Sequence, residues 1–386
     1  MKRHPFLLPP ARFARVAAVT AGAALVLASC TSGSADMPTV PTSVAGGPAP
    51  SGPTVVTPRE ARSVVAPTMT RNNEANSKLD DKLLSTYEAG SAYSLDSASY
   101  VQQRLVKAAT GSDPLAAPFT DRLGAVGVGR QPAFPAQFLA VGNSESLPSK
   151  ASSPTCGSLL DFSRSSATSR WRIVNEPGTL PGAVPSLALR DGYLARLSQT
   201  AVRNADALPA TVARDLIDEE TGASRKPFTR ADFQGNRCWG LPDPRADVVG
   251  AAAGGYAQRD FFSVRSPADT VAYPLANGGT LVLFTIDFHD QMLGGSAGAI
   301  NWSHPSLQKS PSLAWMDLIA RGSYEEVDES GEIEIAATIP KAGSRAGAPF
   351  AIIGDYEGVT GLSGRKAKGT ATTGGGGTLT GFRLPS

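Results

Sequence analysis

Hydrophobic and polar residues alternate with the period of a β-strand in the second half of the chain. In GEIEIAATI (331–339), isoleucine and alanine fill the odd positions from Ile333, and Glu332 and Glu334 lie between them. This pattern predicts a strand of an antiparallel sheet with one apolar and one polar face. Shorter runs predict further strands at 133–143, 157–164, 170–177, 269–275, 279–290, 321–340 and 349–358.

Helical patterns precede each group of strands. Thr57, Pro58 and Glu60 form a capping box with proline at the first helical position, so a helix should begin here. Pro67 is expected to kink or break this helix, and Gly90 to end the helical stretch that follows. Further helices are predicted at 97–109 and 208–223, with another around 245–260.

The stretch NNEANSKLDD (72–81) is rich in asparagine and acidic residues. Asparagine is unfavourable inside a helix, which raises the question whether Asn72, Asn73 or Asn76 faces a cavity or a partner. Solvated helix surface and capping at the Pro67 break are the commoner explanation.

The order of helices and then strands occurs twice along the chain. It predicts an α+β fold of two consecutive helix-then-antiparallel-sheet units, at 57–180 and 181–365. Residues 30–56 are rich in Ser, Thr, Pro and Gly and poor in charge, which is typical of a flexible tether. The Gly-rich end, 366–386, is predicted to be a disordered tail.

A basic segment and then an apolar run open the chain. Lys2, Arg3, Arg12 and Arg15 precede the run 16–29, which is shorter than the roughly twenty residues that a membrane-spanning helix needs. This order predicts an export signal peptide over residues 1–29.

The end of the apolar run specifies the type of signal. Leu27, Ala28, Ser29 and Cys30 resemble the bacterial lipobox. In that interpretation Cys30 becomes the first residue of the mature protein and carries diacylglycerol on its thiol, and the acyl chains anchor the protein at the extracytoplasmic face of the cell membrane. An ordinary cleaved signal with a chance cysteine is the alternative.

The charge balance gives no support for nucleic-acid binding. The chain has 36 basic and 34 acidic residues. Without the four basic residues of the signal, 32 basic residues face 34 acidic ones, and the mature net charge is −2.

Two cysteines, Cys156 and Cys238, remain after Cys30. Outside the cytoplasm such a pair is most simply a disulfide. Two free buried thiols are an alternative. A zinc site with His289 and His304 is a weaker one, because the cysteines lack metal-ligand spacing. We therefore predict no metal site, and no motif indicates a cofactor.

Two motifs contain residues of the kinds that catalytic sites use. Asp287 and His289 in TIDFHD lie on one face of a predicted strand, where an acid and a base could act together, but the polar end of a strand is commoner. Ser296 in GGSAG fits the nucleophile-elbow pattern, yet no helix pattern follows it. No Asp or Glu lies between Ser296 and His304, the last histidine of the chain, so the serine–acid–histidine order of a triad cannot be met.

The stretch RNNEANSKLDDKLLSTYEAGSAYSLDSASY (71–100) resembles the opening of a family of uncharacterised actinobacterial lipoproteins, whose members carry an NN-ANA-LD-LL-TIE-GPLY pattern after a lipobox and a polar linker. The similarity extends through GGTLVLFTIDFHDQ to about residue 360. It implies export, a lipid anchor and an α+β fold, and it names no substrate. By architecture the halves are similar to the nuclear-transport-factor-like cone, in which a curved sheet surrounds a cavity.

These observations together predict a lipid-anchored extracytoplasmic protein. We expect a ligand- or protein-binding accessory module of the cell envelope that performs no catalysis. Its partners would be the membrane, through the lipid, and envelope proteins or a small ligand. A hydrolytic enzyme that uses Asp287 and His289 is one alternative, and a purely structural envelope interaction protein is another.

Overall fold

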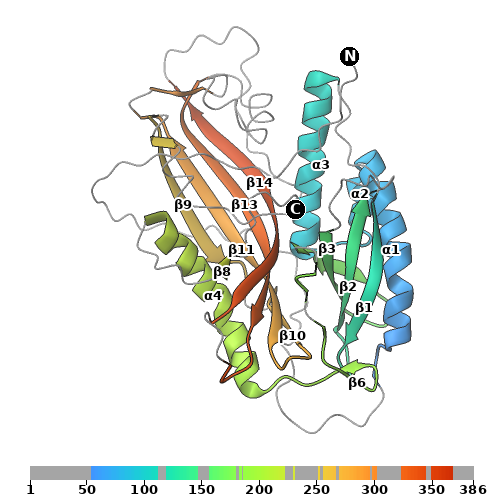
Figure 1. Cartoon of the computed structure of the whole chain (residues 1–386). Coiled ribbons are helices and arrows are strands. Elements are labelled where there is room, and N and C mark those ends of the chain that lie inside the picture. Colours follow the sequence, from blue (N-terminus) through green and yellow to red (C-terminus); the bar gives the residue numbers. More distant parts are fainter. Residues whose placement is uncertain are drawn as a thin grey trace, which may run out of the picture.

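The fold follows from a computed structural model, in which helices alternate with groups of antiparallel strands (Figure 1). The structure describes residues 54–111, 119–146, 156–179, 182–184, 186–221, 229–230, 251–252, 255–266, 269–295, 298–301, 323–344 and 349–367. The predicted signal peptide and nearly all of the predicted tether and C-terminal tail lie outside these residues, although β14 includes Lys366, the first residue of the predicted tail.

The helices are α1 (Pro58–Lys78), α2 (Asp81–Leu84), α3 (Gly90–Thr110) and α4 (Gln199–Thr221). The strands of the first group are β1 (Phe119–Val128), β2 (Ala136–Ser146), β3 (Cys156–Arg164), β4 (Arg172–Asn175), β5 (Gly178–Thr179), β6 (Leu189–Arg190) and β7 (Tyr193–Leu194). The strands after α4 are β8 (Thr229–Arg230), β9 (Ala257–Val264), β10 (Val271–Pro274), β11 (Thr280–Leu293), β12 (Ile300–Asn301), β13 (Ser323–Ile339) and β14 (Ala351–Lys366). Within the described residues, no helix combines the length and apolarity needed to cross a membrane.

Helix α1 begins where the sequence predicts. The hydroxyl of Thr57 accepts a hydrogen bond from the backbone N–H of Glu60 (3.1 Å), and Pro58 is the first helical residue. The predicted break at Pro67 is wrong, because α1 continues through this proline to Lys78. Buried residues on both sides of Pro67 pack against the sheet, and this packing outweighs one lost backbone hydrogen bond.

The predicted end of a helix at Gly90 is also wrong. Helix α1 ends instead at Leu79, which has a left-handed conformation with φ of 52°. Gly90, with φ of 62°, is the first residue of α3, which is much longer than the short helix predicted at 97–109. Glycine occurs where the chain changes direction at either end of a helix. The position of Gly90 alone therefore does not show whether a helix ends or begins there.

All strands of both groups except β6 and β7 join in one 12-stranded sheet, and β6 and β7 pair with each other in a separate two-stranded sheet. The main order of the 12-stranded sheet is β1-β2-β3-β5-β14-β13-β11-β10, with β4 beside β3, β9 beside β11, β12 beside β13 and β8 beside β14. All of these pairs are antiparallel except β8 with β14. The two residues of β5 pair with β3 on one side and with β14 on the other, and so connect the two groups.

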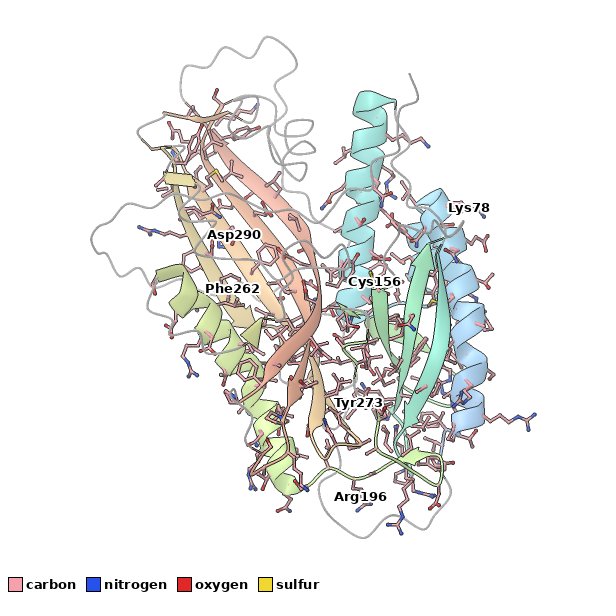
Figure 2. All side chains as sticks on the ribbon, in the orientation of Figure 1. Lys78, Cys156, Arg196, Phe262, Tyr273 and Asp290 are labelled. Atoms are coloured by element: carbon pink, nitrogen blue, oxygen red, sulfur yellow. The ribbon has the colours of Figure 1, made fainter. Side chains whose placement is uncertain are left out.

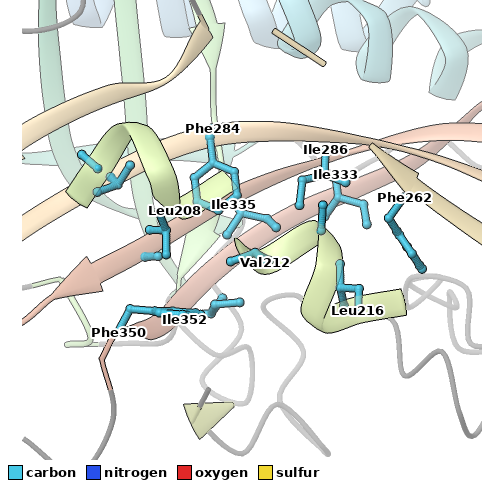
Figure 3. Close-up of a cluster of buried hydrophobic side chains, with 14 of the residues drawn as sticks. Leu208, Val212, Leu216, Phe262, Phe284, Ile286, Ile333, Ile335, Phe350 and Ile352 are labelled. Atoms are coloured by element: carbon cyan, nitrogen blue, oxygen red, sulfur yellow. The ribbon is translucent and has the colours of Figure 1, made fainter. Parts of the chain in front are cut away.

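Three helices cover the sheet in different places. Helix α1 lies on the outer side of β1–β3, above a core that contains the stacked rings of Phe138 and Phe162 (4.6 Å between centroids). Helix α4 covers the outer side of β9, β11 and β13, where its Leu208, Val212 and Leu216 pack on the sheet (Figure 3). Helix α3 stands between the two groups of strands and contacts β4, β13 and β14 (Figure 1).

The position of α3 changes the meaning of the alternating pattern in β13. Ile333 and Ile335 face the core under α4, as the alternation predicts. The opposite face is not open to solvent, because Glu332 and Glu334 have only 7% and 0% of their surface exposed. The polar face that the alternation predicts is therefore a buried face, and a layer of acidic side chains lies beneath α3.

Candidate ligand-binding site

Three carboxylates from separate segments meet beside α3. Glu88 belongs to the connection between α2 and α3, Asp96 to α3 itself, and Glu176 to the connection between β4 and β5. One carboxylate oxygen from each residue lies within 4.8 Å of the other two. We call Glu88, Asp96 and Glu176 the acidic cluster.

Backbone pairing holds Glu88 in place. Glu88 forms an isolated parallel bridge with Ile173 of β4, whose N–H donates to the carbonyl of Tyr87 (2.8 Å) and whose carbonyl accepts from the N–H of Ala89 (2.9 Å). The connection between α2 and α3 thus behaves as a short extension of the sheet. It directs the Glu88 side chain into the interior.

The other two members are held by partners on the sheet. The hydroxyl of Tyr356 on β14 donates to Oδ1 of Asp96 (2.7 Å). The backbone N–H of Glu176 donates to Oε2 of Glu334 on β13 (2.6 Å). Because Glu334 and Tyr356 are register partners, the cluster is tied to one position on the β13–β14 pair.

A polar network fixes the start of α3 next to the cluster. The hydroxyl of Ser91 donates to Oδ1 of Asn175 (3.2 Å) and accepts from the hydroxyl of Thr285 on β11 (3.0 Å). Farther along α3, the hydroxyl of Ser94 donates to Oε1 of Glu332 (2.7 Å). These contacts connect α3 to both groups of strands.

Glu88 is the unusual member of the cluster. Its residue is 1% exposed, and neither carboxylate oxygen has a hydrogen-bond partner among the described residues. Buried polar atoms nearly always have a partner, and an uncompensated buried charge is strongly unfavourable. A buried carboxylate with no partner among the described residues therefore points to a bound ligand.

The proximity of these acids disfavours their ionised forms. Burial raises the pKa of Glu88 well above its ordinary value, and the Asp96, Glu176 and Glu334 carboxylates raise it further. Burial raises the pKa of Asp96 to about 6, although the hydrogen bond from Tyr356 lowers it. Burial likewise raises the pKa of Glu334 to about 8, although the hydrogen bonds from Ser91 and Glu176 lower it. The site can therefore hold protons or a positively charged ligand.

The two residues of the alternative catalytic hypothesis, Asp287 and His289, share a face of β11 but have different surroundings. His289 Nε2 lies 3.4 Å from Oδ1 of Asp328, and its ring stacks on the exposed ring of Phe261. Burial raises the pKa of Asp287, Arg265 lowers it, and Asp269 raises it. The described contacts thus place His289 with Asp328 rather than with Asp287.

The structure describes only part of the cysteine sites predicted from the sequence and of the GGSAG motif. Cys156, at the start of β3, is disulfide-bonded (Figure 2). Its predicted partner Cys238 lies outside the described residues, so the pairing stays a prediction. Cys30 and Ser296 also lie outside them.

The asparagines of α1 have partners inside the protein. Asn72 is 2% exposed, and its Oδ1 accepts from the hydroxyl of Tyr87 (3.3 Å). Asn76 accepts from the hydroxyl of Tyr100 on α3. These bonds join α1 to the segments on either side of the acidic cluster. Asn72 and Asn76 therefore neither form part of a solvated helix surface nor cap a break at Pro67.

The fold and site define an α+β protein with a large, mostly antiparallel sheet and an acidic cluster beside an inserted helix. The chain belongs to the family described as Domain of unknown function (DUF8094), whose model matches residues 53–364. This match indicates no catalytic family. No curated protein and no solved structure shows significant similarity to the chain.

Proposed function

We propose that the protein is a lipid-anchored, extracytoplasmic binding module of the cell envelope that catalyses no reaction. The observation that carries the binding role is the buried, unpartnered carboxylate of Glu88 within the acidic cluster. Such a group costs stability unless a ligand compensates it. The ligand would carry positive charge or donate several hydrogen bonds.

The membrane attachment rests on the sequence of the N-terminus. The basic segment, the short apolar run and the Leu27–Cys30 lipobox support processing at Cys30. The polar tether 30–56 would separate the folded domain from the membrane. The family match begins at residue 53, close to the predicted end of the tether.

The division of the fold into two units is part of the same proposal. Helices α1–α3 precede β1–β4, and α4 precedes β9–β14, which supports two helix-then-sheet units. The pairing of β5 with β3 and β14 joins them in one sheet. A cone-like cavity within each unit stays a prediction.

Replacement of the anchoring cysteine tests the attachment. In Cys30→Ala, the thiol that receives the lipid is missing, so the protein should leave the membrane fraction or remain unprocessed. Fractionation of cells and the intact mass of the protein measure both outcomes. Ser34→Ala, which lies outside the lipobox, should remain attached. A processed Cys30→Ala protein that stays membrane-bound would contradict the anchor.

The binding role is tested by native mass spectrometry. The mature protein from its own host should carry an extra mass that is absent from the denatured protein. Glu88→Gln should lose this mass, whereas Asp328→Asn, on the same face of β13 but outside the cluster, should keep it. A bare wild-type protein that also binds no added cation would contradict a binding role for this site.

A further inference from the structure

We propose that the acidic cluster binds one hard divalent cation, and that Ca²⁺ fits it best. This inference rests on the proposed binding role of the same cluster and names its ligand. The ligands would be one carboxylate group each from Glu88, Asp96 and Glu176.

The spacing of the carboxylates suits a single ion. Calcium binds protein oxygens at about 2.3–2.6 Å, so two oxygens on opposite sides of the ion are separated by roughly 5 Å. The three oxygens lie within 4.8 Å of one another. All three can therefore share one coordination sphere without a movement of the backbone.

The charge of the cluster also favours a cation. Within the described residues, no basic side chain pairs with Glu88 or Asp96, and Arg265, on the same face of the sheet, pairs with Glu332. Glu334 adds a fourth carboxylate beside the cluster, where its Oε2 accepts a hydrogen bond from the backbone N–H of Glu176 (2.6 Å). A divalent cation would compensate the like charges that otherwise oppose one another.

The donor atoms select the kind of cation. The cluster offers carboxylate oxygens and contains neither histidine nor cysteine, a donor set that favours Ca²⁺, Mg²⁺ or Mn²⁺ over Zn²⁺ or Cu²⁺. Mg²⁺ usually keeps several water molecules and binds one or two carboxylates. Three carboxylates from three segments, one of them almost fully buried, suit the larger and more readily dehydrated Ca²⁺.

A cation here would join distant parts of the chain. It would bind the α2–α3 connection, α3 and the β4–β5 connection, and through the Glu176–Glu334 hydrogen bond it would also act on β13. Ion binding would therefore stabilise the position of α3 between the two groups of strands.

A terbium and calcium titration of the full mature chain, after treatment with a chelator, tests the proposal. Tb³⁺ replaces Ca²⁺ in sites made of oxygen ligands. The hydroxyl of Tyr356 donates a hydrogen bond to Asp96, so the tyrosine ring is close enough to sensitise Tb³⁺ emission. We expect saturable binding of one ion per chain, displacement by Ca²⁺, and a rise of the thermal midpoint with Ca²⁺.

The matched variants are Glu88→Gln and Asp96→Asn, with Asp328→Asn as the control. Each cluster variant should weaken Ca²⁺ binding more than about tenfold, because loss of a ligand costs more than loss of a supporting contact. The control should bind as the wild type does. Glu88→Gln removes a buried charge and keeps the side-chain shape, so it should remain folded.

Three results would overturn the cation assignment. The first is a folded wild-type protein that binds neither Tb³⁺ nor Ca²⁺, and the second is undiminished binding in Glu88→Gln. In the third, native mass spectrometry shows an organic mass that depends on Glu88 while Ca²⁺ does not bind. The third result would keep the proposed binding function and reject the cation. The first result, if native mass spectrometry also shows no bound mass, would reject both the cation and the binding function.

Discussion

Buried acids outside the cluster show how a single residue depends on its surroundings. Asp161 on β3 is fully buried between the two groups of strands, where Tyr273 also lies (Figure 2). Its Oδ1 accepts from the hydroxyl of Tyr273 (2.6 Å) and its Oδ2 from Nε2 of Gln137 (2.7 Å). Burial raises the pKa of Asp161 to about 7, although the hydrogen bonds from Tyr273, Gln137 and Asn175 lower it.

This raised pKa makes stability depend on pH. Between the unfolded pKa of about 4 and the folded value, only the folded state keeps the proton, so stability should fall as pH rises. Asp161→Asn should remove a slope of up to about 1.4 kcal/mol per pH unit from the free energy of unfolding, measured by denaturant titration at several pH values. Asp206→Asn, on the exposed side of α4, should leave the slope unchanged. An unaltered slope in Asp161→Asn would contradict this origin.

The members of the acidic cluster could not be predicted individually from the sequence. Glu88 and Glu176 are far apart in the chain, and they meet only because the α2–α3 connection pairs with β4. No short motif encodes such a contact. The one available signal is the pair of glutamates in β13, and it predicts only a polar face, because the sequence does not show that α3 covers these residues.

At the scale of elements, local signals were the reliable ones. The start of α1 was predicted correctly because Thr57, Pro58 and Glu60 act within one turn. The apolar face of β13 was also correct, since alternation depends only on strand geometry. The errors at Pro67 and Gly90 arose where packing or chain direction, set by distant residues, decided the outcome.

The cap of α1 offers a direct test at this scale. Thr57→Ala removes the acceptor for the Glu60 N–H and should lower the free energy of unfolding by about 1 kcal/mol in denaturant titration. Thr70→Ala is a control in the same helix, because Thr70 is exposed and its hydroxyl donates to the helix's own Ala66 carbonyl. It should be neutral or slightly stabilising. Equal losses in the two variants would show that the cap is unimportant.

At the scale of the whole molecule, the join between the two groups of strands is very narrow. Within the sheet it consists of β5, whose Gly178 and Thr179 pair with Asp355 and Gly354 of β14, and an isolated antiparallel bridge between Leu187 and Leu275 adds a second backbone contact. Gly354 has no room for a side chain, since an added Cβ would collide with the carbonyl oxygen of Gly178. No pattern in the sequence indicates this join, because a strand of two residues has no periodicity.

Gly354→Ala should therefore disturb the join. The backbone of Gly178 cannot move aside as a flexible side chain would, so we expect a loss of about 2 kcal/mol or more in the free energy of unfolding. Denaturant titration with far-ultraviolet circular dichroism measures this loss. In Gly129→Ala the added Cβ would meet no atom closer than 3.5 Å, and this control should be nearly neutral. A Gly354→Ala protein as stable as the control would show that β14 and β5 separate at little cost.

The two-residue strand also determines how the protein can be divided. A fragment that ends before α4 would keep β5 but lose β14, and the complementary fragment would carry β14 without β5. Each fragment would expose unpaired backbone donors and acceptors along a strand edge, which is a template for aggregation. Proteolysis or truncation in the connection between β5 and α4 would thus yield two aggregation-prone fragments rather than two soluble domains.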